Sequence, residues 1–141
     1  MAKTVLYVED NFNNALLVKR IVQAEGHIFL NAIDGEKGWQ LALEQAPDLI
    51  FVDLRLQGKM DGLALIERLK GSNELKDVPA IVLTAYGRGS VIKQAREAGC
   101  DGFLHKPADI RQIRAVIREN IGSATKPPQS TSVKTYQSLN T

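Results

Sequence analysis

The stretch Leu49-Ile50-Phe51-Val52-Asp53 decides the fold of this 141-residue chain. Its first four residues are apolar on both faces of an extended strand, a pattern typical of the interior strands of a parallel sheet covered by helices. The run stops at a carboxylate, Asp53. Because open α/β sheets bind ligands at the carboxyl ends of their strands, Asp53 is predicted to lie in a binding crevice.

Four further apolar runs resemble this one, and a helical pattern follows each predicted strand. The five strands are expected at residues 5–8, 27–32, 49–52, 80–83 and 102–104. The helices are expected at about 13–25, 34–46, 63–71, 89–98 and 110–121, and three of them are closed by a glycine. Strands and helices that alternate five times indicate βαβ units. We therefore expect an α/β fold, a (βα)5 domain with a doubly wound, five-stranded parallel sheet.

The composition is that of an ordinary globular domain, with 44% hydrophobic and 24% charged residues. Residues 1–121 contain 16 acidic and 16 basic side chains, and a body without surplus positive charge argues against direct nucleic-acid binding. Cys100 is the only cysteine, which excludes an internal disulfide and fits a reducing compartment. No signal peptide or membrane-length apolar stretch is present. We expect a soluble, cytoplasmic protein without membrane association.

Polar residues stand at or just beyond the ends of four predicted strands: Glu9 and Asp10, Asp53, Thr84, and Lys106. The carboxylates among them would repel one another unless a cation lay between them. Mg²⁺ prefers carboxylate oxygens and also binds phosphate. The sequence therefore predicts a divalent-metal site built around an aspartate that takes up phosphate.

Five short motifs occur along the chain in a fixed order. They are Val8-Glu9-Asp10-Asn11, Asp53-Leu54, Met60-Asp61-Gly62, Leu83-Thr84-Ala85 and His105-Lys106-Pro107. Together with the (βα)5 count, they resemble the receiver domain of bacterial two-component response regulators over residues 1–121. The resemblance implies the flavodoxin-like, CheY-like strand order 2-1-3-4-5 and a stand-alone receiver. Residues 122–141, rich in Ser, Thr, Gln and Pro, are predicted to form a disordered tail.

The resemblance also implies a role for each acidic residue. Asp53 would be the phosphoacceptor, since a carboxylate can attack phosphorus to give an aspartyl-phosphate. Asp10 and Asp53 would contact Mg²⁺ directly, and the backbone carbonyl of Arg55 would complete the protein ligands. Glu9 would act on the metal through water.

Other residues are implied to bind the phosphoryl group or to respond to it. The Thr84 hydroxyl and the Lys106 ammonium would bind the phosphoryl oxygens. Pro107 would follow a cis peptide bond. Phe103 occupies the position of a switch aromatic, whose ring would rotate when Thr84 moves toward phosphate. This would change the outer face formed by the fourth helix, the fifth strand and the fifth helix.

Two bulky side chains fill variable positions of the family. Arg55 and Tyr86 lie two residues beyond Asp53 and Thr84, where side chains govern the access of water to the phosphoryl group. We expect them to shield that group and to lengthen the phosphorylated lifetime.

A leucine in the first predicted helix is a candidate for partner docking. On a helical wheel, Leu17 belongs to the apolar arc, whereas Leu16 falls among Lys19, Arg20 and Gln23. Histidine kinases and phosphotransfer proteins tend to dock on this helix in the family, so Leu16 is predicted to contact such a partner.

The resemblance implies a signalling protein rather than an enzyme with an outside substrate. It would take a phosphoryl group from a phosphohistidine of a sensor kinase or phosphotransfer protein, and would catalyse only its own phosphorylation and dephosphorylation. Output would come through an unknown downstream protein or through a phosphorelay, from a monomer or weak dimer.

Two alternative functions share features of this sequence. A flavodoxin-like FMN binder would need a Ser/Thr/Gly-rich loop in place of Glu9-Asp10-Asn11. A haloacid-dehalogenase-type phosphatase would need a second aspartate in place of Arg55.

Overall fold

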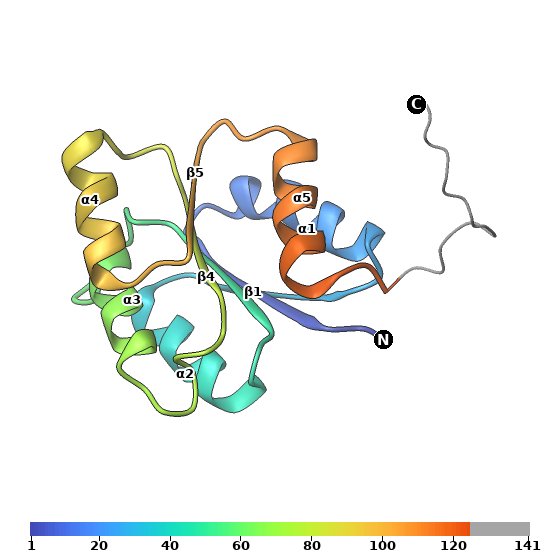
Figure 1. The fold of residues 1–141 in the computed structure, drawn as a ribbon, viewed down its shortest axis with the longest axis horizontal. Helices are drawn as coiled ribbons and strands as arrows, with labels where there is room; N and C mark the ends of the chain where they lie inside the picture. The colour runs from blue at the N-terminus through green and yellow to red at the C-terminus, as the bar shows by residue number, and fades with distance from the viewer. Residues whose placement is uncertain (125–141) are drawn as a thin grey trace.

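A computed structural model of the chain describes residues 1–124. Its five strands are β1 (Thr4–Val8), β2 (Ile28–Ala32), β3 (Leu49–Val52), β4 (Ala80–Thr84) and β5 (Gly102–His105). Its helices are α1 (Phe12–Ala24), α2 (Gly35–Gln45), α3 (Gly62–Lys70), α4 (Gly89–Ala98) and α5 (Ile110–Ile121). All strand pairs are parallel, in the order β2-β1-β3-β4-β5. The predicted fold is confirmed (Figure 1).

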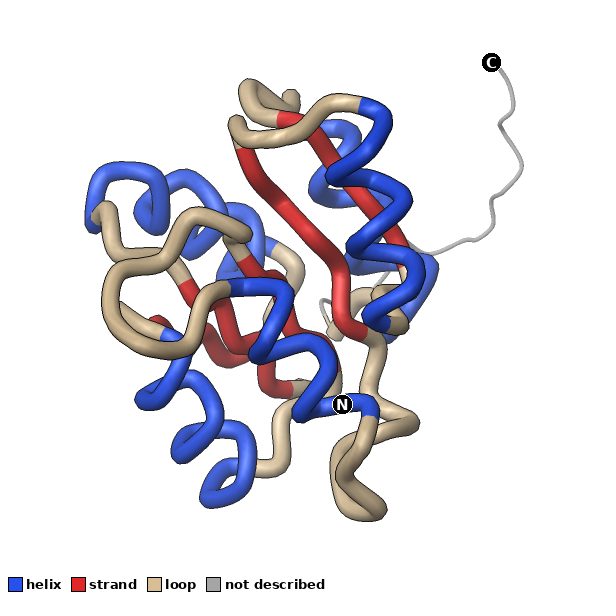
Figure 2. Tube along the Cα trace, turned by 90° about the vertical axis from the view of Figure 1, so that its left-hand side faces the viewer, coloured by secondary structure: helices blue, strands red, loops and turns tan. Residues whose placement is uncertain are grey.

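Helices cover both faces of the sheet, α1 and α5 on one side and α2, α3 and α4 on the other (Figures 1 and 2). Neighbouring strand residues point to opposite faces, so Leu6 and Val8 pack under α2 and α3, while Val5 and Tyr7 pack under α1 and α5. All four residues of β3 are buried. The continuous apolar run therefore forms the interior strand that its composition predicts.

The strand register brings residues distant in sequence to one edge of the sheet. Val52 of β3 pairs with Val8 of β1 and with Val82 of β4, and Thr84 pairs with His105 of β5. The residues that follow these pairs therefore emerge side by side at the carboxyl ends of the strands.

Side-chain caps fix the starts of most helices. Asn11, Asp34, Asp61 and Asp109 precede α1, α2, α3 and α5, and each accepts a hydrogen bond from a backbone N–H of the first turn. The exception within residues 1–124 is α4, which begins after Arg88 without a side-chain cap.

The end of α5 is fastened to α1 and β2 at the opposite edge of the sheet. Both carboxylate oxygens of buried Glu25 accept hydrogen bonds from Arg118, and its carbonyl accepts from Ala124 N at 2.8 Å. His27 Nε2 lies 2.7 Å from the carbonyl oxygen of Gly122. Apart from residues 122–124, the predicted tail lies outside the described residues. No helix within residues 1–124 is long and apolar enough to cross a membrane.

Candidate functional site

Asp53 lies at the centre of the predicted site, immediately after β3, with only 6% of its surface exposed. Its Oδ1 accepts a hydrogen bond from the Thr84 hydroxyl at 2.6 Å and another from Arg55 N at 3.0 Å. Its Oδ2 accepts one from Lys106 Nζ at 3.2 Å. A nearly buried carboxylate thus has charge-assisted partners on both oxygens, which a buried charge requires.

Glu9 is still more buried, at 1% exposure, and belongs to the same hydrogen-bond network. The Lys106 ammonium and the Tyr7 hydroxyl both donate to its Oε1, the latter at 3.0 Å. Asn11 N donates to Oε2 at 3.0 Å. Lys106 therefore bridges Glu9 and Asp53, which directly follow the neighbouring strands β1 and β3.

Tyr7 is a site residue that the sequence analysis treats only as part of a strand. Its ring is fully buried, in edge contact with Phe51. Burial, together with the negative charge of Glu9, raises the pKa of the Tyr7 phenol far above its ordinary value, so the hydroxyl is a permanent donor. The signal was present in the sequence, because residues two apart on a strand share one side of the sheet.

Asp10 is exposed and makes no hydrogen bond or ion pair within residues 1–124. Over the same residues, no group of three or more His, Cys, Asp or Glu side chains is arranged as a metal site, and Lys106 contacts both Glu9 and Asp53. The donor chemistry nevertheless fits a hard cation. Two carboxylates, of Glu9 and Asp53, contact the Lys106 ammonium, and the carboxylate of Asp10, next to Glu9 in the chain, is open to solvent.

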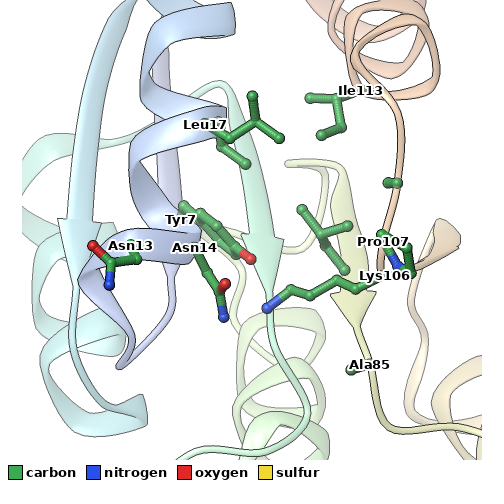
Figure 3. Close-up of a pocket in the computed structure, with 11 residues that line it drawn as sticks. Tyr7, Asn13, Asn14, Leu17, Ala85, Lys106, Pro107 and Ile113 are labelled. Carbon is green, nitrogen blue, oxygen red and sulfur yellow. The ribbon is translucent and has the colours of Figure 1, made fainter.

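Lys106 extends from the loop after β5 across a cavity of about 410 Å³ between α1 and α5 (Figure 3). The Lys106–Pro107 peptide bond is cis. The Lys106 ammonium lies 5.8 Å from the centre of the Tyr7 ring, and Leu17 and Ile113 form apolar walls of the cavity. The cavity thus joins an apolar groove to the lysine of the site.

The prediction that Leu16 is the exposed leucine of α1 is wrong. Leu17 is 40% exposed and lines this cavity, whereas Leu16 is half-buried beside Phe12 and Phe29. The helical wheel does not show that the edge of its apolar arc opens onto a groove rather than onto the core. A docking role for Leu16 stays a prediction.

Phe103 is half-buried, with its ring centre 4.9 Å from that of His105. His105 Nε2 lies 3.0 Å from the carbonyl oxygen of Gly87 in the loop between β4 and α4. A Cβ added to Gly87 would lie 3.0 Å from Phe103 Cζ. The loop that follows Thr84 therefore rests directly on the ring of Phe103, and His105, a motif residue without a predicted role, contacts this loop as well.

Arg55 and Tyr86 contact each other beside the site. The guanidinium carbon of Arg55 lies 4.8 Å from the centre of the Tyr86 ring. Their backbones hold the central groups: Arg55 N donates to Asp53, and Tyr86 N donates to Thr84 Oγ1 at 3.1 Å. The two loops that carry these side chains are thus hydrogen-bonded to Asp53 and Thr84.

A model of the response regulator receiver domain family matches residues 5–118. The polar-differentiation response regulator DivK from Brucella anthropi is 32% identical over 124 residues, which are 88% of this chain and 100% of that protein. This confirms a likeness to DivK that the residues from Val8 to Asn14 and around Cys100 also indicate.

Two solved structures share the fold of this chain. The receiver domain of the sensor histidine kinase PA1611 from Pseudomonas aeruginosa, with a magnesium ion coordinated in its active-site cleft, is 26% identical with a TM-score of 0.78, and the match covers 87% of this chain and 100% of that one. The chemotaxis protein CheY4 of Vibrio cholerae, 21% identical, shares the fold with a TM-score of 0.78 over 86% of this chain and 100% of its own.

Proposed function

This chain belongs to the response regulator receiver domain family of two-component signalling, and on that premise we propose that Asp53 is its phosphoacceptor. The phosphoryl donor would be a phosphohistidine of a sensor kinase or of a histidine phosphotransfer protein. The observation that carries the proposal is the convergence of Thr84, Lys106 and a backbone N–H on the nearly buried carboxylate of Asp53.

The proposed chemistry forms one bond and breaks another. A carboxylate oxygen of Asp53 attacks phosphorus while the bond from phosphorus to the histidine nitrogen breaks, and the imidazole leaves with the electron pair. The aspartyl-phosphate would carry about 1.5 to 2 negative charges, in place of the single charge of the free carboxylate. Lys106 and Thr84 would bind the new oxygens, and their hydrogen bonds to Asp53 support this role. The protein contributes position and charge neutralisation, and it would catalyse only its own phosphorylation and dephosphorylation.

Mg²⁺ is the cofactor that this donor set supports. Asp10, Asp53 and the carbonyl of Arg55 would hold the ion, with Glu9 acting through water. When bound, the ion would neutralise charge on the transferring phosphoryl group. The magnesium ion reported in the cleft of the PA1611 receiver supports this assignment.

Output is proposed to pass through the face formed by α4, β5 and α5. If the Thr84 hydroxyl moves toward the phosphoryl group, the loop that follows it moves as well, and Gly87 in that loop rests on Phe103. The ring would then shift within β5 and alter the surface offered to a downstream protein. Taking the two states from 1:99 to 99:1 requires a bias of about 5.5 kcal/mol. A phosphorelay would instead pass the phosphoryl group onward.

The cavity beside Lys106 is the proposed docking site for the partner that carries the phosphohistidine. An apolar side chain of the phosphohistidine-bearing partner would enter between Leu17 and Ile113, next to the lysine that binds phosphate. Leu17, rather than Leu16, is then the leucine of α1 with the larger contact. The side chains of Arg55 and Tyr86, which contact each other, would shield the aspartyl-phosphate from water and lengthen its lifetime.

The deciding experiment is intact mass and phosphate-affinity gel mobility after incubation with acetyl phosphate and Mg²⁺. The parent chain should gain one phosphoryl group in the presence of Mg²⁺. It should gain none when EDTA replaces Mg²⁺ in the incubation. Asp53→Asn should gain none, while Asp77→Asn, which alters an exposed aspartate away from the site, should behave like the parent. An equal adduct on Asp53→Asn, or none on the parent, would contradict the proposal.

A further inference from the structure

A second cavity, of about 610 Å³, is lined by residues of the two loops next to Asp53 and Thr84. It opens between the loop after β3, which supplies Arg55, and the loop between β4 and α4, which supplies Tyr86, Gly87 and Arg88. Ser90 in the first turn of α4 completes its polar lining. The proposed metal ligation uses only the backbone carbonyl of Arg55, and the side chains of Arg55, Arg88 and Ser90 have no part in metal ligation or in docking of the donor.

The charge of this pocket is one-sided. Arg55 and Arg88 line it and no acidic residue does, although the domain as a whole is balanced. Within residues 1–124 neither guanidinium forms an ion pair, whereas Arg114 and Arg118 are both paired with Glu25. Two unpaired arginines in one hollow therefore favour an anionic occupant.

The side chains are also arranged for recognition rather than for solvation alone. The Arg55 guanidinium lies over the Tyr86 ring and makes no hydrogen bond within residues 1–124, and Arg binds carboxylates through two N–H donors at once. Tyr86 is 44% exposed. Exposed Tyr and Arg are the residue types that dominate the energetics of protein interfaces.

We propose that this pocket binds an acidic segment of a partner protein, through carboxylates placed on Arg55 and Arg88. The occupant would touch both loops whose backbone N–H groups donate to Asp53 and Thr84. It would also lie against Gly87, a lining residue of the pocket that packs on Phe103. A bound partner would thereby fix the loops around the phosphoacceptor. This consequence for signalling rests on the proposed function, whereas the binding itself does not.

The test is a titration of the unphosphorylated, isotopically labelled full chain with an acetylated, amidated hexaglutamate peptide, followed by backbone amide chemical shifts. Shifts should concentrate at Arg55 and at residues 86–91, and hexaglutamine should cause none. Arg88→Ala should weaken binding about tenfold, the effect expected from losing one charge-assisted contact. Arg96→Ala, which removes an exposed arginine of α4 outside the pocket, should change the affinity less than twofold.

Equal losses for Arg88→Ala and Arg96→Ala, or shifts scattered over the surface, would show nonspecific attraction and overturn the proposal. Inorganic phosphate is titrated at the same ionic strength. If it binds the same amides as tightly as the peptide does, the pocket is a simple anion site and the proposal is also wrong. Because no phosphorylation is involved, failure of Asp53 to accept phosphate would leave these results unchanged.

Discussion

The buried hydroxyl of Tyr7 donates a hydrogen bond to Glu9 Oε1, the same oxygen that the Lys106 ammonium contacts. Two donors therefore share one carboxylate oxygen at the floor of the site. If Lys106 moves toward a phosphoryl group on Asp53, the phenol stays behind and keeps Glu9 from being an unpaired buried charge. Tyr7 thus lowers the free-energy cost of releasing Lys106.

Tyr7→Phe is expected to slow phosphorylation, because Lys106 becomes the only side chain that satisfies Glu9 Oε1 and is held more firmly there. The rate constant with acetyl phosphate should fall by about five- to tenfold, or about 1–1.4 kcal/mol. The ring contact with Phe51 survives the change. Stopped-flow measurement over a range of acetyl phosphate concentrations checks this. An unchanged rate constant, with urea unfolding confirming a folded variant, would contradict this role.

Thr84 is expected to matter through its hydroxyl rather than its shape. The hydroxyl donates to Asp53 and accepts from Tyr86 N, and the residue is fully buried. Thr84→Val keeps the volume but leaves both groups without this partner, which should lower the free energy of unfolding by about 1–3 kcal/mol. Thr84→Ser retains the hydroxyl and should cost no more than about 1 kcal/mol, the value of one buried methyl group.

Urea unfolding of the two Thr84 variants checks this ranking. Phosphorylation by acetyl phosphate gives a second readout, since Thr84→Ser should approach the parent rate and Thr84→Val should not. If Thr84→Ser proves the more damaging change in both measurements, methyl packing rather than hydrogen bonding dominates at this position.

Much of the site follows from the sequence because strand ends are positioned by the sheet. Continuous apolar runs fix parallel pairing, and parallel pairing then places Glu9, Asp53, Thr84 and Lys106 at one edge whatever the loops do. The roles proposed for these residues come from the family resemblance and not from this geometry.

Contacts that depend on helix rotation or loop shape do not follow in this way. The wheel gives α1 an apolar arc but not its rotation against α5, so the relative exposure of Leu16 and Leu17 is misjudged. The contact between Arg55 and Tyr86 joins two loops whose paths are set by tertiary packing. Neither the rotation of α1 against α5 nor the contact between these two loops produces a repeating pattern in the sequence from which it could be predicted.

Two glycines that each begin a helix should respond oppositely to alanine. A Cβ at Gly62 would lie 2.4 Å from the carbonyl oxygen of Asp53 and 2.5 Å from Leu54 Cα, backbone atoms that cannot move aside cheaply. Gly62→Ala should therefore destabilise the domain by about 1–3 kcal/mol or more. Gly89 has nothing within 4 Å, so Gly89→Ala should be neutral or stabilise by up to about 1 kcal/mol.

Chemical denaturation of both glycine variants, followed by fluorescence of the single Trp39, gives this comparison directly. Gly62→Ala should also lower phosphorylation by acetyl phosphate, because relief of the contact displaces the backbone of Asp53. Equal stabilities for Gly62→Ala and Gly89→Ala would mean that α3 can shift away from β3 at little cost.

The ion pair between Glu25, at the end of α1, and Arg118 of α5 should make the free energy of unfolding depend on pH in the acid range. Arg118 Nε and Nη2 donate to the two oxygens of Glu25 at 2.6 and 3.1 Å, and these hydrogen bonds hold the pKa of that buried carboxyl below its ordinary value. The folded-state pKa is thus depressed relative to the unfolded chain. The stabilisation is therefore complete above the ordinary pKa of about 4.3 and is lost as the pH falls through the folded-state value.

Glu25→Gln should accordingly be less stable than the parent at pH 7, by about 1–3 kcal/mol, because one hydrogen-bonded charge is removed from beside Arg118. The difference should shrink as the pH is lowered toward 3, since the parent then loses the same charge by protonation. Urea unfolding at each pH measures it. Glu119→Gln, an exposed change on α5 without an ion pair in the described part of the chain, should show only a small difference throughout. A Glu25→Gln deficit that stays constant down to pH 3 would mean that packing, not charge, stabilises this end of the domain.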